Sequence, residues 1–410
     1  MMQEREVLII GGGAAGFFTA INLAEANPDL KITILERGKE VLTKVRISGG
    51  GRCNVTHAEF IPKELSKNYP RGEKELLGPF HQFMTGDTIA WFDERGIELK
   101  TEEDGRMFPI TDSSETIIDC FLAETERLNI EIKTGHSVQD IQQNNDCWLV
   151  KTSKGDFTAD QLVMATGSNP KIWKLLEKLG HQIVQPVPSL FTFNIQDHRI
   201  KDLAGISTFA HIKILDKKLE SDGPLLITHW GLSGPGILKL SAWGARILEA
   251  RNYHFKIQVN WLGYTTAEEI SEKIKRLKHK FAKQQLTTHA QFNLPKRLWL
   301  SLLKAARFPE DQKWAELSNK QIHKLAQELT QCQLTVNGKS TFKEEFVTAG
   351  GVDLKEINFK TFESKLHPKL YLAGEILNID AITGGFNFQN AWTGGFLAAQ
   401  AIAKSVVNEN

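Results

Sequence analysis

Short apolar runs separated by glycine-rich turns open the chain. Residues 7–10 form a continuous apolar run, which is typical of a strand buried in a parallel sheet. Apolar residues then recur at helical spacing between Phe17 and Ala24, and a second predicted strand over residues 31–35 ends at Glu36. The pattern predicts a strand, a helix and a second strand in the order of a βαβ unit.

The same order returns near the other end of the chain. Residues 370–373 are predicted to form a buried strand and residues 391–403 an apolar helix, with the glycine-rich stretch "TGGFNFQ" between them. A further apolar run over residues 162–165 stops at Thr166 and Gly167. Such a stop is expected where a chain passes close over a cofactor, but an ordinary sheet strand followed by a turn explains it equally well.

The middle of the chain follows another pattern. Between residues 188 and 263, short or alternating apolar runs are separated by Gly, Asp and Asn, which predicts antiparallel strands. The stretch "TTAEEISEKIKRLKHKFAKQQL" changes to helical periodicity, helical segments continue to about residue 331, and "CQLTVNG" and "FKEEFVTAGGV" return to strands. The sequence therefore predicts a β-rich and a helical insertion between two halves of an α/β domain.

Three glycines in the first turn, Gly11, Gly13 and Gly16, form the motif G-x-G-x-x-G, with Ala14 and Ala15 at the start of the helix. In a dinucleotide site the first glycine allows the tight turn, the second lets the pyrophosphate touch the backbone, and the third lets the helix pack close to the strand. A glycine-rich turn can also serve close packing alone. Strand, turn, helix and second strand occur here in register, which favours the dinucleotide site.

Glu36 lies twenty positions after Gly16, at the end of the second predicted strand. A carboxylate at this position binds both ribose hydroxyls of an adenosine, and it disfavours NADP because it would repel a 2′-phosphate. A solvated strand end is the alternative. Two strand–turn–helix units at the two ends of the chain favour FAD over NAD, because extended FAD needs its pyrophosphate at one helix and its isoalloxazine ring near a second helix N-terminus.

Composition narrows the class of protein. The chain has 410 residues, 41% of them hydrophobic and 24% charged, with a formal net charge of +1, which predicts two or three domains without a strong global field. Its four cysteines form no C-x-x-C pair, so no zinc or other metal site and no dithiol motif is predicted. With neither a signal-peptide pattern nor an apolar run of about 20 residues, the sequence predicts a cytoplasmic protein that does not span a membrane.

The motifs "GGGAAG", "ISGGGRCNVT", "ATGS", "THWGLSGPG", "VTAGGV" and "LAGEILNIDAITGGFNFQNAWTGG" occur in this order along the chain. In these motifs the chain resembles the bacterial FAD-dependent flavoproteins grouped as aminoacetone oxidase-like or bile-acid reductase-like enzymes. The resemblance implies an α/β fold, with a Rossmann-like FAD-binding domain of the two-dinucleotide-binding type over residues 1–188 and 346–410. It further implies an inserted antiparallel β-rich domain over 189–263 and 332–345 and a small helical domain over 264–331.

The resemblance also places "SGGGRCN" against the flavin. Two departures stand out: the family usually has Asp and Gly where this chain has Asn378 and Ala381, and Thr43 and Arg46 beside Lys44 do not match its pattern. Together with the first turn, the resemblance predicts these cofactor-binding residues: Gly11, Gly13, Ala14, Ala15, Gly16, Glu36, Arg37, Lys44, Ser48, Gly49, Gly50, Gly51, Arg52, Cys53, Asn54, Thr166, Gly167, Gly374, Glu375, Asp380, Gly384, Gly385, Phe386, Asn387 and Gln389.

Two residues are candidates for catalysis. His229, in "THWGLSGPG", is of the type that exchanges protons near neutral pH, although a turn histidine without a catalytic role fits as well. Cys53 could protonate or attack a substrate, but a cysteine in a glycine-rich turn is more often structural. Ser233 is no hydrolase nucleophile, because Pro235 stands where G-x-S-x-G requires glycine.

One basic run stands out in the predicted helical segment. It contains Lys273, Lys275, Arg276, Lys278, Lys280 and Lys283, which usually form the solvated face of an amphipathic helix. The alternative is a phosphate-contacting patch for RNA, which matters because some members of the resembled family reduce uracil in ribosomal RNA.

The leading hypothesis is an FAD-dependent oxidoreductase that moves a hydride between flavin N5 and an activated C=C or C–N bond. Three versions remain open: a reductase that forms dihydrouridine in ribosomal RNA, an amine oxidase that produces peroxide, and a flavoprotein that binds RNA or senses redox state without turnover. No second G-x-G-x-x-G unit follows the first, so NADH or NADPH is expected only as a transient electron donor.

Overall fold

The computed structural model describes residues 5–144, 147–340 and 347–408. In it the chain forms two compact units. Unit 1 contains the described residues up to 187 and from 347 onward, and unit 2 contains residues 188–340. The domain boundary predicted at residues 345 and 346, and most of the strand predicted around "FKEEF", lie outside the described residues.

A seven-stranded sheet forms the centre of unit 1, with the strand order β20-β21-β22-β10-β1-β2-β6. Five neighbouring strands are parallel: β22 (Leu370–Leu372), β10 (Gln161–Met164), β1 (Glu6–Ile10), β2 (Lys31–Glu36) and β6 (Glu131–Thr134). The short strands β20 (Ile357–Asn358) and β21 (Glu363–Ser364) add an antiparallel edge. The two predicted strand–turn–helix units therefore share one sheet, which confirms the Rossmann-type α/β prediction.

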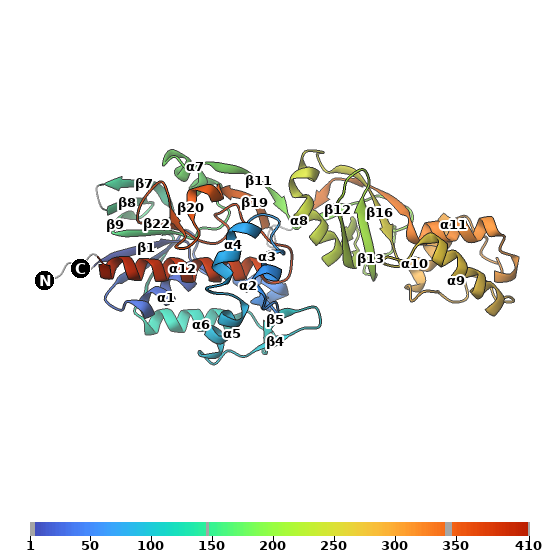
Figure 1. Cartoon of the computed structure of the whole chain (residues 1–410), viewed down its shortest axis with the longest axis horizontal. Coiled ribbons are helices and arrows are strands. Elements are labelled where there is room, and N and C mark those ends of the chain that lie inside the picture. Colours follow the sequence, from blue (N-terminus) through green and yellow to red (C-terminus); the bar gives the residue numbers. More distant parts are fainter. Residues whose placement is uncertain (1–4, 145–146, 341–346, 409–410) are drawn as a thin grey trace. The chain divides into compact units, whose positions relative to one another are not determined.

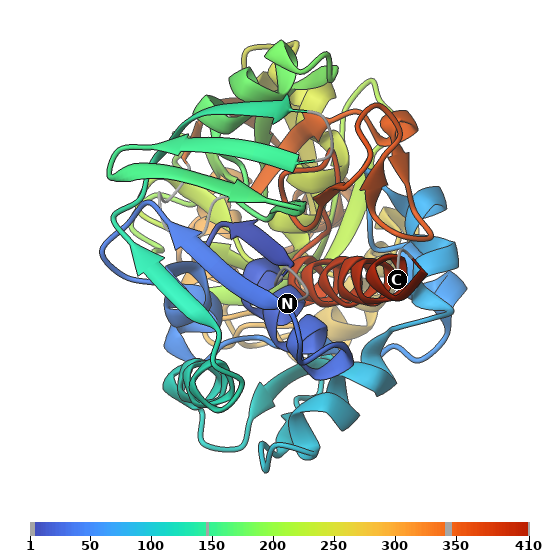
Figure 2. The same cartoon turned by 90° about the vertical axis from the view of Figure 1, so that its left-hand side faces the viewer.

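Two long helices from opposite ends of the chain lie side by side in unit 1 (Figure 1, Figure 2). They are α1 (Ala14–Ala26) and α12 (Phe386–Asn408). A Cβ added to Gly395 would lie 3.0 Å from Thr19 Oγ1 and 3.1 Å from the carbonyl oxygen of Ala15, so glycine favours this close approach. The prediction that the last helix begins at residue 391 was wrong, because its polar first turn hydrogen-bonds to other parts of unit 1.

The remaining elements of unit 1 surround this sheet. Its shorter helices are α2 (Thr43–Gly51), α3 (Pro62–Ser66), α4 (Glu73–Phe80), α5 (Thr85–Asp93), α6 (Glu115–Arg127) and α7 (Pro170–Lys178). One three-stranded sheet has the order β3 (Thr56–His57), β5 (Arg106–Pro109), β4 (Leu99–Thr101), and another consists of β7 (Val138–Asn144), β8 (Cys147–Thr152) and β9 (Gly155–Ala159). Strands β11 (Ile183–Ser189) and β19 (Val347–Val352) form a pair.

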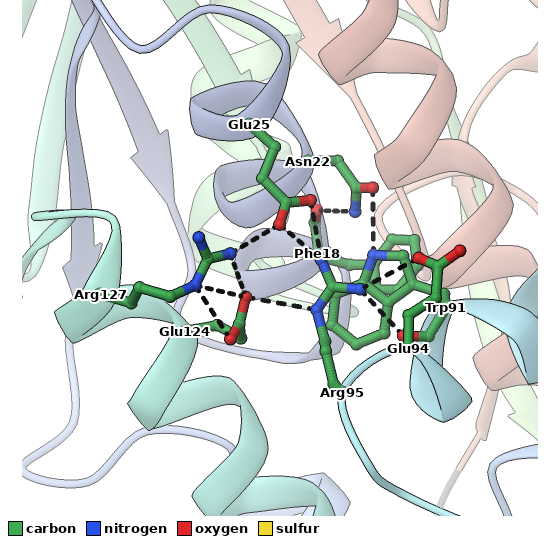
Figure 3. Close-up of polar contacts among 8 residues, drawn as sticks. All are labelled: Phe18, Asn22, Glu25, Trp91, Glu94, Arg95, Glu124 and Arg127. Atoms are coloured by element: carbon green, nitrogen blue, oxygen red, sulfur yellow. Dashed lines mark hydrogen bonds and ion pairs between the residues drawn. The ribbon is translucent and has the colours of Figure 1, made fainter.

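A charged cluster joins α1, α5 and α6 (Figure 3). The guanidinium of Arg95 lies 3.7 Å from the centre of the Trp91 ring, and it pairs with Glu25 of α1 and Glu124 of α6 at 2.7 and 3.3 Å. The indole nitrogen of Trp91 donates to Asn22 Oδ1 at 3.2 Å. The Arg95 side chain is only 10% exposed, so this cluster holds the helix that carries the first glycine turn against its neighbours.

Unit 2 is built on a seven-stranded antiparallel sheet, which confirms the predicted antiparallel strands. The prediction missed a 15-residue helix, α8 (Pro235–Glu249), which lies inside the stretch 188–263 that was expected to form strands. Its order is β17 (Cys332–Asn337), β16 (His254–Asn260), β13 (Ser207–Ile214), β14 (Glu220–Ile227), β15 (Gly231–Ser233), β12 (Thr192–Asn194) and β18 (Lys339–Ser340). Its helices are α8 (Pro235–Glu249), α9 (Ala267–Lys280), α10 (Lys296–Ala305) and α11 (Asn319–Thr330). Strands and helices share one buried core, and a division of this unit into a β-rich and a helical domain stays a prediction.

Within the described ranges, every helix is either too short or too polar to serve as a membrane span.

Candidate cofactor site

The first glycine turn brings β1, β10 and α1 close together. Gly11 has φ +116°, and a Cβ there would lie 2.3 Å from the carbonyl oxygen of Ala165 at the end of β10. A Cβ on Gly16 would lie 2.0 Å from the carbonyl oxygen of Gly11. At Gly13, by contrast, a Cβ would meet no described atom within 4 Å, so the turn is tight on its inner side and open at the start of α1.

The N-terminus of α1 can receive an anion. Gly13 is its N-cap, and among the described residues no side chain caps this end and no acid stands in the first turn. The N–H groups of a first helical turn lack partners within the helix and carry a partial positive charge. Ala14 and Ala15 supply backbone at this end without bulky side chains, which is the arrangement that binds a pyrophosphate.

Glu36 is held at the carboxyl end of β2, beside the same turn. Its Oε2 accepts a hydrogen bond from the Gly12 amide at 2.9 Å, and its Oε1 accepts one from the Gly38 amide at 2.6 Å. A carboxylate has about four acceptor sites, so two backbone donors fix its orientation and leave capacity for hydroxyl groups. Its contact with a ribose stays a prediction, as does a contact from the exposed Arg37.

The glycines of "SGGG" have different local roles. Helical geometry stops at Ser48, with ψ 150°, and Gly49, Gly50 and Gly51 follow with φ of +58°, +71° and +85°, a region that favours glycine. A Cβ on Gly49 would lie 2.9 Å from the ring of Phe108, whereas at the two exposed glycines that follow it would meet no described atom within 4 Å. The first of the three glycines is therefore needed for packing, and the other two expose bare backbone.

Arg52 turns toward protein partners. Its Nη1 lies 2.6 Å from Glu102 and 3.4 Å from Asp112, and its guanidinium lies 3.9 Å from the centre of the Phe108 ring. The two carboxylates raise the pKa of Arg52, and the hydrogen bond that Arg52 donates to Glu102 contributes most. The guanidinium thus anchors the glycine segment to β5, and cofactor binding by Arg52 stays a prediction.

Cys53 and Asn54 complete this segment inside unit 1. Cys53 is fully buried with φ +59°, and burial raises the pKa of its thiol to about 12. The thiol is therefore protonated at neutral pH and lacks the thiolate that nucleophilic chemistry needs. With its amide oriented to satisfy its neighbours, Asn54 accepts from the Gly385 amide at 2.9 Å and donates to the Thr56 carbonyl at 3.0 Å, which brings the two predicted glycine segments together.

The carboxyl ends of β10 and β22 contribute a second group of predicted residues. Lys44 Nζ donates to Glu375 Oε2 at 2.6 Å, and Glu375 Oε1 accepts from the Thr348 amide at 3.0 Å. A Cβ on Gly167 would lie 3.7 Å from Glu375 Oε2. Thr166 has a buried hydroxyl without a hydrogen-bond partner among the described residues, a state that a bound ligand would relieve.

Gly374 connects this group to the first turn. It has φ +79°, and a Cβ there would lie 3.2 Å from the Cβ of Ala15 and 3.9 Å from that of Ala391. The start of α1, the end of β22 and the first turns of α12 therefore meet at one place, where the chain keeps small residues.

The segment before α12 is held mainly by buried side chains. Asp380 is fully buried and forms an ion pair with Arg71, while Asn387 Oδ1 accepts from the Ala381 amide at 3.0 Å. Gln389, also fully buried, accepts from Thr56 Oγ1 at 2.6 Å. These three predicted cofactor ligands thus have partners in the protein that fix the loop, and their contacts with a cofactor stay predictions.

The residues present fit FAD. The open Gly13, the uncapped start of α1, the fixed carboxylate of Glu36 and the unpartnered hydroxyl of Thr166 lie along the carboxyl ends of the parallel strands, where open α/β sheets bind their ligands. Gly384 and Gly385, with φ of +139° and +93°, lead into α12, whose N-terminus can face the flavin ring. Over the described ranges, no group of three His, Cys, Asp or Glu side chains could hold a metal ion.

The other predicted residues lie in unit 2. His229 is exposed in the turn between β14 and β15, and its catalytic role stays a prediction. Five members of the basic run, Lys273, Lys275, Arg276, Lys280 and Lys283, are exposed, and Lys278 is half-buried. Two members have protein partners: Lys275 pairs with Glu272 at 2.7 Å, and Lys278 donates to the Leu317 carbonyl at 2.6 Å.

Sequence reasoning missed several residues that shape the site. Arg71 pairs with Asp380, Tyr69 donates its hydroxyl hydrogen to the Phe386 carbonyl at 2.6 Å, and His57 lies 3.0 Å from the Gly384 carbonyl. None belongs to a motif, and their partners are more than three hundred positions away in the sequence. Only "VTH", directly after the glycine segment, could have pointed to His57.

Comparison with known proteins agrees with this geometry. The family model described as "HI0933-like protein Rossmann domain" matches residues 5–401. The chain is 29% identical to a "Ribosomal RNA dihydrouridine synthase" of Haemophilus influenzae over 98% of this chain and 100% of that protein. It is 28% identical to a "3-dehydro-bile acid delta(4,6)-reductase" of Clostridium scindens over 97% of this chain and 98% of that protein.

Solved structures agree on the fold. A 3-ketosteroid-delta4-(5alpha)-dehydrogenase from Rhodococcus jostii RHA1 aligns with 98% of this chain and 98% of its own, with a TM-score of 0.51 and 11% identity. A match at this identity shows the fold alone: a Rossmann-type FAD-binding α/β fold with an additional antiparallel sheet and helices.

Proposed function

Because the chain belongs to the HI0933-like Rossmann-domain family of FAD-dependent oxidoreductases, we propose that it reduces a conjugated carbon–carbon double bond and that its substrate is uracil in ribosomal RNA. One observation carries the proposal. Two relatives that match nearly the whole chain are named for reductions of carbon–carbon double bonds, one in ribosomal RNA and one in a bile acid. The choice of ribosomal RNA as the substrate rests on the name of the Haemophilus influenzae relative and on the basic residues exposed in unit 2.

FAD, when bound, supplies the hydride chemistry through N5 of its isoalloxazine ring. The protein binds and orients it: the N-terminus of α1 for the pyrophosphate, Glu36 for the adenosine ribose, and the exposed backbone of Gly50 and Gly51 beside the ring. The four residues Lys44, Thr166, Gly167 and Glu375 would contact the cofactor between these ends. The remaining predicted ligands, from Ser48 to Gln389, either complete the site or hold its loops.

Turnover of a reductase needs an electron donor. We propose NADH or NADPH as a transient donor, because the chain has no second G-x-G-x-x-G unit that would hold a nicotinamide permanently. His229 is the proposed proton donor to the substrate. Its replacement by glutamine should lower kcat without changing reduction of the flavin by the nicotinamide, which single-turnover absorbance measurements would separate.

Unit 2 supplies the proposed RNA contact. Residues 264–331 contain thirteen Lys and Arg against seven Asp and Glu, a net charge of +6, whereas the whole chain has +1. Positive charge confined to one segment attracts phosphates locally. A ribosomal substrate would also place the protein in the cytoplasm.

The direct test uses the full-length protein loaded with FAD. Unmodified ribosomal RNA transcripts and NADH or NADPH should give dihydrouridine, detected in nucleoside digests by mass spectrometry as a uridine that has gained two hydrogens. Reduction of a steroid enone without dihydrouridine would overturn the ribosomal substrate but leave the reduction of a double bond. Peroxide formation from small amines would overturn both and favour an amine oxidase. Flavin that is never reduced in the presence of candidate substrates would favour a non-catalytic flavoprotein.

A further inference from the structure

His57 lies between the turn that precedes α12 and the turn that precedes β5. It is the last residue of β3, three positions after Asn54, and is half-buried. Its Nδ1 lies 3.0 Å from the carbonyl oxygen of Gly384, so Nδ1 carries the proton and donates it to that oxygen. Its ring lies 4.5 Å from the ring of Phe386, at an interplanar angle of 30°.

The opposite edge of the imidazole faces the turn before β5. Gly105 in that turn has φ +85°, and a Cβ there would lie 2.6 Å from His57 Nε2 and 2.9 Å from Cε1. A side chain at this position would collide with the imidazole. The ring is thus enclosed on one side by the Gly105 backbone and on the other by the Gly384 carbonyl and the Phe386 ring.

Two other side chains hold the same short segment. Asn54 accepts from the Gly385 amide at 2.9 Å, and Tyr69 donates to the Phe386 carbonyl at 2.6 Å. A Cβ on Gly385 would lie 2.5 Å from the Thr56 carbonyl oxygen, so this turn also passes directly against the strand that carries His57. Gly384 and Gly385 adopt positive φ immediately before α12, and the direction of their peptide groups therefore depends on these partners.

We propose that His57 is a positioning residue for FAD, which holds the Gly384–Gly385 turn so that the N-terminus of α12 points at the isoalloxazine ring. It acts through the carbonyl of Gly384, to which its Nδ1 donates at 3.0 Å. The physical reason is preorganisation: a turn of two glycines has many accessible conformations, and fixing it before the ligand arrives removes an entropic cost from binding. The inference rests on FAD binding and is independent of the substrate.

Replacement of His57 tests the hydrogen bond. His57→Ala removes both the donor and the ring, and we expect the dissociation constant for FAD to rise about tenfold, with a shifted flavin absorbance band and midpoint potential. His57→Asn keeps a donor near the position of Nδ1, and it should restore most of the affinity and the wild-type spectrum. Thermal unfolding of the apoprotein reports whether a variant folds.

Gly105→Ala displaces the imidazole from the other side, and Gly96→Ala is its matched control. Both glycines have positive φ, +85° and +72°, but a Cβ at Gly96 would meet no described atom within 4 Å. Both variants should lose similar stability from backbone strain, while only Gly105→Ala should weaken FAD binding and shift the potential. The proposal would be overturned if His57→Ala and Gly105→Ala both kept the wild-type FAD affinity and midpoint potential. It would also be overturned if Gly105→Ala and Gly96→Ala lost FAD affinity equally. A wild-type protein that binds FAD but makes no dihydrouridine would contradict only the proposed substrate.

Discussion

At the scale of single residues, Gly11 and Gly13 differ in what a side chain would meet. A Cβ at Gly11 would lie 2.3 Å from a backbone oxygen, whereas at Gly13 it would meet no described atom within 4 Å. We predict that Gly13→Ala lowers the unfolding free energy of the apoprotein by less than about 1 kcal/mol, since alanine is the poorer N-cap, but weakens FAD binding at least about tenfold, because the methyl group occupies the space of the pyrophosphate. Urea unfolding and FAD fluorescence titration measure the two quantities.

The matched variant is Gly11→Ala. Its methyl group would collide with the end of β10, and its φ of +116° is unfavourable for alanine, so we expect a loss of at least about 2 kcal/mol in stability. Equal loss of stability in the two variants would show that the space beside Gly13 is needed for packing. Unchanged FAD affinity in Gly13→Ala would show that the pyrophosphate binds elsewhere.

The four cysteines give a second prediction at this scale. Burial raises the pKa values of Cys53 and Cys332 to about 12 and that of Cys120 to about 11, whereas Cys147 is half-exposed. Because the thiolate is the reactive form, we expect DTNB at pH 8 to modify one thiol quickly in the native protein and all four after unfolding. Cys147→Ser should abolish the fast phase. Rapid labelling that persists in this variant would show that one of the buried thiols, Cys53, Cys120 or Cys332, is reactive.

Single residues also show which features of the site could be predicted from the sequence. The tight glycine turn ahead of α1 is local, so the spacing of three glycines was enough to predict it. The partners of Arg52 were not predictable, because Glu102 and Asp112 lie 50 and 60 positions away and nothing in the motif marks an acid as a partner. Asp380 was likewise predicted from its motif to bind the cofactor, whereas in the structure it forms an ion pair with Arg71.

At the scale of elements, Arg95 connects three helices through a nearly buried guanidinium (Figure 3). Arg95→Ala would remove the ring contact with Trp91 and leave Glu25 and Glu124 without their least exposed cationic partner. A fully buried pair costs about 3–5 kcal/mol when broken. Since Glu25 is 34% exposed, we expect a smaller loss of about 2–3 kcal/mol, measured by urea unfolding.

Arg127 offers the matched control for this cluster. It pairs with the same two acids, Glu25 and Glu124, at 2.7 and 2.5 Å, but its side chain is 54% exposed. Arg127→Ala should therefore cost less than about 1 kcal/mol. Similar losses in the two variants would mean that burial of Arg95 and its ring contact add nothing to the ion pairs.

Element boundaries failed where polar side chains have distant partners. The helix at the end of the chain was expected to begin at its first apolar stretch, but α12 begins at Phe386. Its first turns contain Asn387 and Gln389, whose hydrogen bonds go to Ala381 and Thr56. Apolar periodicity cannot detect such a start, because polar residues that are satisfied inside the protein interrupt the pattern.

At the scale of the whole molecule, a buried histidine couples stability to pH. His181 Nδ1 lies 2.7 Å from Glu356 Oε2, and His181 Nε2 lies 3.1 Å from Ser364 Oγ. Ser364 Oγ also accepts from the amides of Leu366 and His367, so its hydrogen is directed at His181 Nε2, which is unprotonated. The serine is buried and its lone pairs are occupied, which excludes a hydrolase triad despite the Ser–His–Glu order.

Burial lowers the pKa of His181 below its usual 6.5. The unfolded chain therefore binds a proton more readily than the folded one, and the contribution of this group to stability is complete above the unfolded pKa and is lost as pH falls toward the folded value. We predict that urea midpoints fall between pH 7 and pH 5, and that His181→Gln reduces this slope. Parallel pH profiles in the two proteins would show that other groups control acid unfolding.

The positive charge of unit 2 leads to a prediction that distinguishes direct RNA contact by α9 from attraction of RNA by net charge. Lys273, Arg276 and Lys280 are exposed on α9, whereas Lys275 and Lys278 already have protein partners. Each phosphate neutralised by a bound cation releases counterions, with a slope of about −0.7 in log K against log salt for a single strand. Changing the three exposed residues to glutamate should therefore weaken RNA binding at least about tenfold and reduce the salt slope by about 2, measured by fluorescence anisotropy.

The control is a triple change of equal charge elsewhere in unit 2. Lys201, Lys217 and Lys218 are exposed outside the helical segment, so replacing them with glutamate alters the net charge by the same amount without touching α9. Long-range attraction depends on the total charge of the protein, whereas direct contact depends on where the charges lie. Only the α9 variant should therefore show a smaller slope of log K against log salt. Equal effects of the two triple variants would mean that RNA responds to net charge alone. Unchanged binding in the α9 variant, with FAD still bound, would place the RNA contact on another surface.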